Sequence, residues 1–160
     1  MGKSTVGRYL AKELMLEFYD SDRVIEESAG AAISWIFDKE GESGFRKREA
    51  SVIDDLTQKR GIVLATGGGV VLREENRRHL VTRGTVIYLV SSLDHLVERT
   101  QRSSTRPLLQ GGKAMDVFEK LQLERGPLYR EVSDYEYNAE HTTPRVLARN
   151  ISRAILSNEP

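Results

Sequence analysis

The chain has 160 residues, enough for one domain whose core needs no disulfides or metal, and it has no cysteine, so thiolate zinc sites and cysteine nucleophiles are excluded. Its 24 basic and 24 acidic side chains cancel, which argues against a nucleic acid or an anionic membrane as a partner reached through bulk charge. No apolar run approaches the roughly 18 residues of a membrane span, and a signal-peptide pattern is missing, so we expect a cytoplasmic protein, acting as a monomer.

The first third of the chain predicts helices around one short apolar segment. Apolar residues recur every four positions over 4–14, which is typical of an amphipathic helix. A short apolar stretch, 17–19, follows and leads into acidic residues. The charged block 23–58 predicts helices interrupted near Gly30 and Gly41.

Three apolar runs in the remainder predict strands. The run 62–66 is continuous and ends in three glycines, the pattern of a strand buried on both faces of a parallel sheet. The run 85–90 is a second such strand, and 135–138 is a weaker third. Helical patterns lie at 74–82, 93–102, 115–131 and 145–156. Strands alternating with helices indicate an α/β fold with a parallel sheet, and we predict a single domain over 1–160.

The tripeptide Gly2-Lys3-Ser4 matches the last three positions of the phosphate-binding loop G-x-x-x-x-G-K-[ST], and a predicted helix follows it. In such a loop, backbone N–H groups and the lysine hold phosphates, while the hydroxyl holds magnesium. The first half of the loop and the strand before it are absent from the sequence. Taken alone, the tripeptide is at least as compatible with a plain helix N-terminus capped by serine.

Four further segments, together with this tripeptide, make the chain resemble the shikimate kinases, which are P-loop kinases of the nucleoside-monophosphate-kinase-like group. They are FYDSD at 18–22, GFRKRE at 44–49, TGGGVV at 66–71, and the pair RPLL at 106–109 with ERGPLY at 124–129. The resemblance runs from Gly2 to the C-terminal helix in the family's order and spacing.

The resemblance implies a three-layer α/β fold with a lid. Its central parallel sheet has the strand order 2-3-1-4-5 and is flanked by helices, with the lid at about 101–113 and an acceptor-binding helical region at about 22–59. The implied activity is ATP-dependent phosphorylation of the shikimate 3-hydroxyl in chorismate and aromatic amino-acid biosynthesis. Two other functions stay open: a gluconate-type kinase of the same fold, and a shikimate-binding or regulatory module that does not turn ATP over.

In that strand order, the strand missing from this sequence is the central one. Losing about four buried apolar side chains at roughly 1.5 to 3 kcal/mol each would forfeit about 6 to 12 kcal/mol. That is comparable with the whole stability of a typical domain, roughly 5 to 15 kcal/mol. We therefore expect the natural product to begin upstream of Met1, and a chain that starts there to fold poorly or bind ATP weakly.

The resemblance also implies the residues that bind ATP and its Mg²⁺ cofactor. The ATP-binding set is Gly2, Lys3, Ser4, Thr5, Arg99, Arg106 and Pro144. Ser4 and Asp20 are the implied metal residues. Arg106 precedes a proline in the predicted loop, so it could swing over the phosphates, although an exposed loop arginine is the ordinary alternative. The implied catalytic residues are Lys3, Asp22 and Arg106.

Acidic and basic residues in the middle of the chain are the candidate acceptor site. Asp22 follows a predicted parallel strand, where it either faces the ligand crevice or belongs to a turn that caps the next helix. Arg46 has Glu42 and Glu49 on its own helical face, so a solvated ion-pair surface is the simple alternative. A guanidinium can, however, bind a carboxylate with two hydrogen bonds.

By resemblance, Asp22 binds shikimate hydroxyls and is the candidate base, while Arg46 and Arg125 bind the shikimate carboxylate. Gly67, Gly68 and Gly69 line the pocket by the same resemblance, since missing side chains let a ligand approach the backbone. Arg125 precedes a glycine and a proline, and this Gly-Pro pair predicts a helix end at that point.

Overall fold

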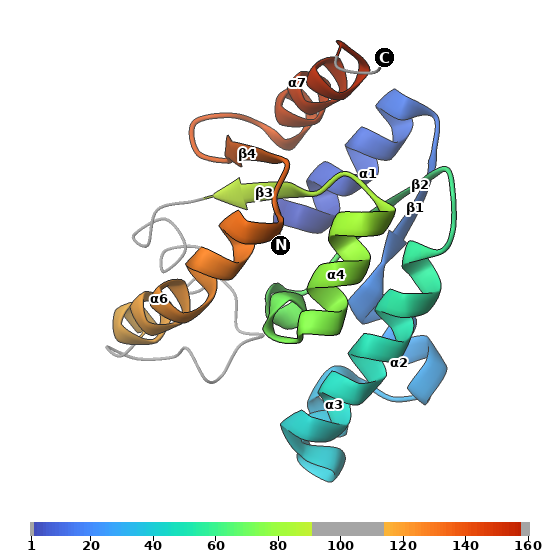
Figure 1. The fold of residues 1–160 in the computed structure, drawn as a ribbon, viewed down its shortest axis with the longest axis vertical. Coiled ribbons are helices and arrows are strands. Elements are labelled where there is room, and N and C mark those ends of the chain that lie inside the picture. Colours follow the sequence, from blue (N-terminus) through green and yellow to red (C-terminus); the bar gives the residue numbers. More distant parts are fainter. Residues whose placement is uncertain (1, 91–113, 158–160) are drawn as a thin grey trace. The chain divides into compact units, whose positions relative to one another are not determined.

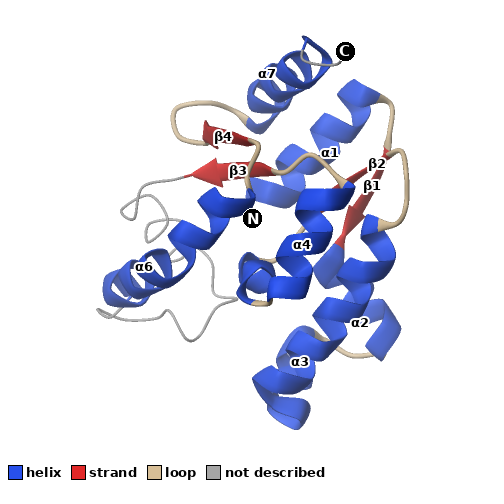
Figure 2. Ribbon diagram, in the orientation of Figure 1, coloured by secondary structure: helices blue, strands red, loops and turns tan. Residues whose placement is uncertain are grey.

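The structure is a computed structural model that describes residues 2–90 and 114–157. It falls into two compact units, and each is described by itself below. The first unit comprises Met1–Gly84 and Thr142–Pro160, and the second comprises Thr85–His141. Figures 1 and 2 show the helices and strands of both units.

The first unit contains a two-stranded parallel sheet and most of the helices. Its elements are α1 (Gly2–Leu14), β1 (Glu17–Asp20), α2 (Ser21–Ala29), α3 (Ile33–Thr57), β2 (Ile62–Ala65), the 3₁₀ helix η1 (Gly68–Leu72), α4 (Glu74–Arg83) and α7 (Pro144–Ser157). Glu17 lies opposite Ile62, and Asp20 lies opposite Ala65. The carboxyl ends of both strands therefore meet at one edge of the sheet, where the acidic segment and the glycines follow.

Two glycines interrupt the helices of the first unit where the sequence predicts. Gly30 follows α2 with φ of 69° and donates its N–H to the Glu26 carbonyl. Gly41 has φ of 73° inside α3 and kinks that helix. Both positions need the left-handed backbone that glycine adopts without penalty, so these predicted breaks are confirmed.

Two groups of buried side chains form the core of this unit. Between α2 and α3 the buried cluster is Ile25, Ile36, Phe45, Val52 and Leu56. The helices α1 and α7 pack side by side (Figure 1) and bury Val6, Leu10, Ala11, Leu147, Ala148 and Ile151. Full burial stabilises the fold by about 1.5–3 kcal/mol for each large aliphatic side chain, and this packing holds α2 against α3 and α1 against α7.

The second unit contains β3 (Ile87–Val90), α6 (Ala114–Val132) and β4 (Tyr135–Asn138). The two strands are parallel, with Ile87 opposite Tyr135. In the expected order 2-3-1-4-5, β1 and β2 correspond to the second and third strands, and β3 and β4 correspond to the fourth and fifth. The observed pairs β1–β2 and β3–β4 agree with that order. The predicted helix at 93–102 and the predicted lid at 101–113 lie outside the described residues.

The expected helix end at Gly126-Pro127 is wrong, because α6 continues through both residues to Val132. Proline removes one backbone donor, yet contacts beyond it hold the last turns in place: the rings of Tyr129 and Tyr88 are 4.9 Å apart, and Val132 is buried. Tertiary packing therefore outweighs the local cost of the proline. Within the ranges described, no helix has the length and apolar character that a membrane crossing needs.

Candidate active site

The first turn of α1 and the end of β1 bring a hydroxyl and a carboxylate together. Ser4 Oγ donates a hydrogen bond of 2.7 Å to Asp20 Oδ2, although the two residues are 16 positions apart. Because α1 spans Gly2–Leu14, Ser4 lies inside the helix, and its hydroxyl donates to Asp20 in place of capping α1. Two oxygen atoms beside a helix N-terminus suit a magnesium ion whose remaining ligands are phosphates and water.

Asp20 also performs the capping role that was the alternative for this acidic segment. Its Oδ1 accepts a 3.0 Å hydrogen bond from the Asp22 backbone N–H, which caps the N-terminus of α2. The cap fixes the Asp20 carboxylate with one oxygen on α2 and the other on Ser4. The cap uses the backbone N–H of Asp22 and not its carboxylate, so the carboxylate can make other contacts.

The Asp22 carboxylate lies against the backbone of Gly67. A Cβ atom built on Gly67 would be 3.1 Å from Asp22 Oδ1, closer than most side-chain contacts. The first glycine after β2 therefore leaves the space that this carboxylate occupies. The two predicted acceptor residues lie together at the carboxyl edge of the β1–β2 sheet.

The guanidinium of Arg46 lies against the third glycine. A Cβ on Gly69 would be only 2.5 Å from Arg46 Cζ, and closer still to both terminal nitrogens, so no side chain fits there unless Arg46 moves. The structure thus brings four predicted acceptor residues, Asp22, Gly67, Gly69 and Arg46, to one region. Gly68 lies between the two contacting glycines and begins η1.

The ion pairs considered as an alternative for Arg46 are present, but one of them is buried. Arg46 donates from Nη1 to Glu49 Oε1 at 2.9 Å and from Nε to Glu42 Oε2 at 3.3 Å. The Glu49 side chain is 1% exposed, whereas the Glu42 side chain is 62% exposed. The buried Glu49 carboxylate fixes the orientation of the Arg46 guanidinium. Burying a charged carboxylate costs free energy of desolvation, which an ion pair on a solvated surface does not require.

The sequence names Glu49 only as a possible surface partner of Arg46, and does not show that Glu49 is buried. At i+3 from Arg46 on a charged helix, it looks like any exposed helical partner. The buried positions that follow it at Ala50, Val52 and Ile53 are the signal that this face of α3 turns inward.

Aromatic rings border the Arg46 guanidinium. Arg46 Cζ lies 5.2 Å from the centroid of the Phe45 ring. Phe37 stacks on Phe45 with centroids 4.7 Å apart, and Phe37 stays 38% exposed. Apolar surface beside a cation suits a small ligand that has both a carboxylate and a hydrophobic ring face.

The predicted nucleotide residues of the first unit lie at two helix starts. Gly2, Lys3 and Thr5 belong to the first turn of α1, where Lys3 and Thr5 are exposed. Pro144 is the first residue of α7, which packs against α1. Backbone N–H groups and the dipole of a helix N-terminus favour phosphate groups, so the start of α1 can hold the nucleotide phosphates.

Three predicted arginines remain: Arg99, Arg106 and Arg125. Arg125 lies on α6 in the second unit, where its Nε is buried without a hydrogen-bond partner in the structure. Its role as a carboxylate ligand stays a prediction. Arg99 and Arg106 lie outside the described residues.

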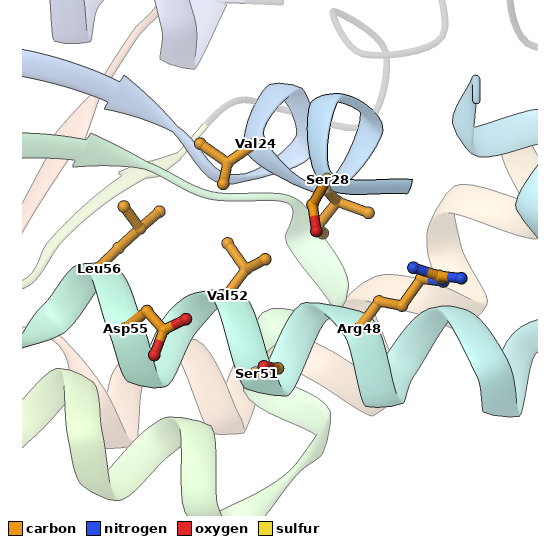
Figure 3. Close-up of a pocket in the computed structure, with 8 residues that line it drawn as sticks. Val24, Ser28, Arg48, Ser51, Val52, Asp55 and Leu56 are labelled. Atoms are coloured by element: carbon orange, nitrogen blue, oxygen red, sulfur yellow. The ribbon is translucent and has the colours of Figure 1, made fainter. Parts of the chain in front are cut away.

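A separate hollow of about 210 Å³ lies between α2 and α3 (Figure 3). Its lining residues are Val24, Ile25, Ser28, Arg48, Ser51, Val52, Asp55 and Leu56. Because successive residues of a helix differ by about 100°, Arg48 points roughly 160° away from Arg46. In addition, Arg48 donates to both Glu40 oxygens at 2.8 Å, and this raises the pKa of Arg48 above its ordinary value. The hollow is therefore distinct from the acceptor region.

A polar cluster joins the C-terminal part of α3 to α4. Arg83 Nη1 donates to Asp54 Oδ1 at 2.7 Å, and the pKa of Asp54 is lowered, chiefly by this hydrogen bond and with a smaller contribution from His79. Arg83 also donates to Thr57 Oγ1 at 3.0 Å. These contacts hold the C-terminal half of α3 against α4, the helix that follows η1.

Comparison with known proteins gives a consistent result. The shikimate kinase family model matches residues 1–156. Shikimate kinases of Legionella pneumophila (strain Corby) and Actinobacillus succinogenes are 60% and 58% identical over 150 and 151 residues, and each match spans 94% of this chain and 86% of the relative.

Solved structures give the same result. Shikimate kinase from Acinetobacter baumannii in complex with shikimate superposes with a TM-score of 0.93 at 47% identity, covering 99% of this chain and 88% of that one. Shikimate kinase from Aquifex aeolicus superposes with a TM-score of 0.84 at 34% identity, covering 98% and 91%.

The fold and the site together define a P-loop kinase of the α/β class. Hydroxyl, carboxylate and helix N-terminus lie at the start of α1, and an acidic and a basic side chain flank the glycines after β2. The chain belongs to the shikimate kinase family.

Proposed function

We propose that this chain transfers the γ-phosphoryl group of ATP to the 3-hydroxyl of shikimate. The observation that carries the proposal is the placement of Asp22 and Arg46 against Gly67 and Gly69. A carboxylate that can accept from hydroxyls and a guanidinium that can bind a carboxylate are the two groups needed to hold a small hydroxylated acid. The shikimate complex of the Acinetobacter relative supports the same acceptor.

On the nucleotide side, we assign the phosphates to the start of α1. Gly2, Lys3, Ser4 and Thr5 would surround them with backbone N–H groups, a cationic side chain and hydroxyls. Ser4 and Asp20 fit a Mg²⁺ ion, because their oxygens are already 2.7 Å apart and a magnesium site needs few protein ligands when phosphates supply others. When bound, the ion neutralises charge on the phosphate oxygens.

On the acceptor side, Arg46 holds the carboxylate of the substrate and Asp22 orients its hydroxyl. In the transfer, a bond forms between the hydroxyl oxygen and the γ-phosphorus, while the bond from that phosphorus to the oxygen of the leaving ADP breaks. Asp22 accepts the proton that the hydroxyl loses. Since phosphoryl transfer depends mostly on positioning and charge, orientation is the larger part of this contribution.

Three arginines and a proline complete the proposal. Arg125 is assigned to the substrate carboxylate, Arg106 to the transferring phosphoryl group, and Arg99 and Pro144 to the adenine side. We further propose that the chain works as a cytoplasmic monomer. The absence of cysteine is compatible with that compartment.

A coupled assay of ADP release with shikimate as the acceptor tests the proposal. We expect ADP release to require shikimate and Mg²⁺ together, and Arg46→Ala to raise the KM for shikimate by about two orders of magnitude, since a guanidinium–carboxylate pair is lost. Arg46→Lys is the matched variant, because it keeps the charge but not the two-pronged geometry. Release with gluconate in place of shikimate would assign the chain to the gluconate-type kinases. Shikimate binding by calorimetry without ADP release would make it a binding module.

A further inference from the structure

The five-residue helix η1 begins with Gly68 and Gly69 of the acceptor region, directly after Gly67, and side chains of α4 hold its C-terminal end. A 3₁₀ helix this short leaves its last carbonyl groups without partners inside the helix. Asn76 Nδ2 donates to the Val70 carbonyl at 3.0 Å. Arg77 Nη1 donates to the carbonyls of Val71 at 2.7 Å and Leu72 at 3.3 Å. Two neighbouring residues of α4 thus bind three successive carbonyls of η1.

Asn76 is the buried member of this pair. It is 1% exposed, and its Oδ1 has no hydrogen-bond partner in the structure. A buried amide with an unsatisfied oxygen destabilises a fold relative to an apolar side chain of similar size. An apolar side chain at this position would lack the N–H that Asn76 donates to the Val70 carbonyl.

The Val70 carbonyl is two peptide units from the glycine that faces Arg46. Val70 follows Gly69 directly, is itself 3% exposed, and donates its N–H to the Gly67 carbonyl at 3.3 Å. A shift of the Val70 peptide therefore moves both glycines. Since a Cβ on Gly69 would already overlap the Arg46 guanidinium, the clearance between this backbone and Arg46 is small.

We propose that Asn76 is a positioning residue of the acceptor site: by holding the Val70 carbonyl, it sets the Gly67–Gly69 backbone against Asp22 and Arg46. The inference rests on the proposed function for its kinetic consequence, but its structural consequence is independent of that function. The side-chain hydrogen bond of Asn76 goes to η1, which together with Gly67 faces Asp22 and Arg46, so we expect its loss to affect the acceptor site more than the nucleotide site.

The test compares Asn76→Leu, which keeps the size and removes the donor, with Ile151→Val in α7. Ile151 is 1% exposed and packs in the α1–α7 core, so its truncation lowers stability without touching η1. We expect Asn76→Leu to raise the KM for shikimate about five- to tenfold, because one buried hydrogen bond is lost. The KM for ATP should change less than about twofold. Ile151→Val should leave both KM values unchanged.

Equal KM values for shikimate in Asn76→Leu and the unchanged chain would overturn the proposal, and so would equal increases in both KM values. If Asn76→Leu does not fold, Asn76→Ser replaces it, because the serine hydroxyl is too short to reach the Val70 carbonyl. If the unchanged chain itself releases no ADP, the proposed function fails and hydrogen exchange decides this inference. Faster exchange of amides 67–72 in the Asn76 variant, but not in Ile151→Val, supports it, and unchanged exchange refutes it.

Discussion

Adding one methyl group to Gly69 is a direct test of the site geometry. In Gly69→Ala the new Cβ would lie 2.5 Å from Arg46 Cζ, whereas carbon atoms in contact are about 3.5–4.0 Å apart. The guanidinium must therefore move by about 1–1.5 Å. The Gly69 backbone does not have the positive φ that alanine avoids, so the effect is on Arg46 and not on the local chain.

The movement of Arg46 breaks its 2.9 Å hydrogen bond to the buried Glu49 carboxylate. A hydrogen bond between charged groups contributes about 1.5–3 kcal/mol, and each 1.36 kcal/mol is a factor of ten. We expect the KM for shikimate to rise about 10- to 100-fold in Gly69→Ala, with the KM for ATP changed less than about twofold. Steady-state ADP release at varied shikimate and saturating ATP measures the effect.

Gly84→Ala is the matched control, because a Cβ there would lie 4.0 Å from the nearest atom, the Leu80 carbonyl oxygen. It should change neither KM. If Gly69→Ala binds shikimate as tightly as the unchanged chain, then Arg46 does not hold the acceptor in the conformation described, and the argument from the glycine contacts is wrong.

Two further substitutions test other parts of the molecule. Ser4→Ala should raise the Mg²⁺ concentration for half-maximal activity about tenfold or more and leave the KM for shikimate unchanged, as a magnesium titration would show; an unchanged titration would remove Ser4 from the metal site. Asp54→Asn tests the lowered pKa of Asp54, which is caused chiefly by the hydrogen bond from Arg83. The ionised carboxylate stabilises the fold above about pH 4, and this stabilisation is lost as the pH falls through the folded pKa of Asp54. The unchanged chain should melt at a higher temperature than Asp54→Asn at pH 7, and the gap should close toward pH 3. A gap that is constant with pH would contradict this assignment.

Local chemistry explains why the helices and strands could be predicted from the sequence. Gly30 and Gly41 end or kink helices because their backbone angles are ones that other residues avoid. The apolar run ending at Ala65 predicts a strand in a parallel sheet, and β2 pairs in parallel with β1. The error at Pro127 has a different origin. Contacts beyond the proline hold α6 together, and those contacts involve a strand more than 30 residues earlier, which no local pattern contains.

The sequence leaves two interpretations open for the acidic segment 20–22 and for Arg46, and in each case the structure combines the two. Asp20 caps α2 through one oxygen and accepts from Ser4 through the other, so the cap fixes the carboxylate that contacts the first turn of α1. Arg46 is ion-paired along α3, as a surface residue would be, but its nearest partner is buried. Charge spacing along a helix gives the pairing of Arg46 and Glu49 and says nothing of their burial. Burial depends on α3 packing against α2 and α4, and it converts an ordinary ion pair into one that holds the guanidinium against Gly69.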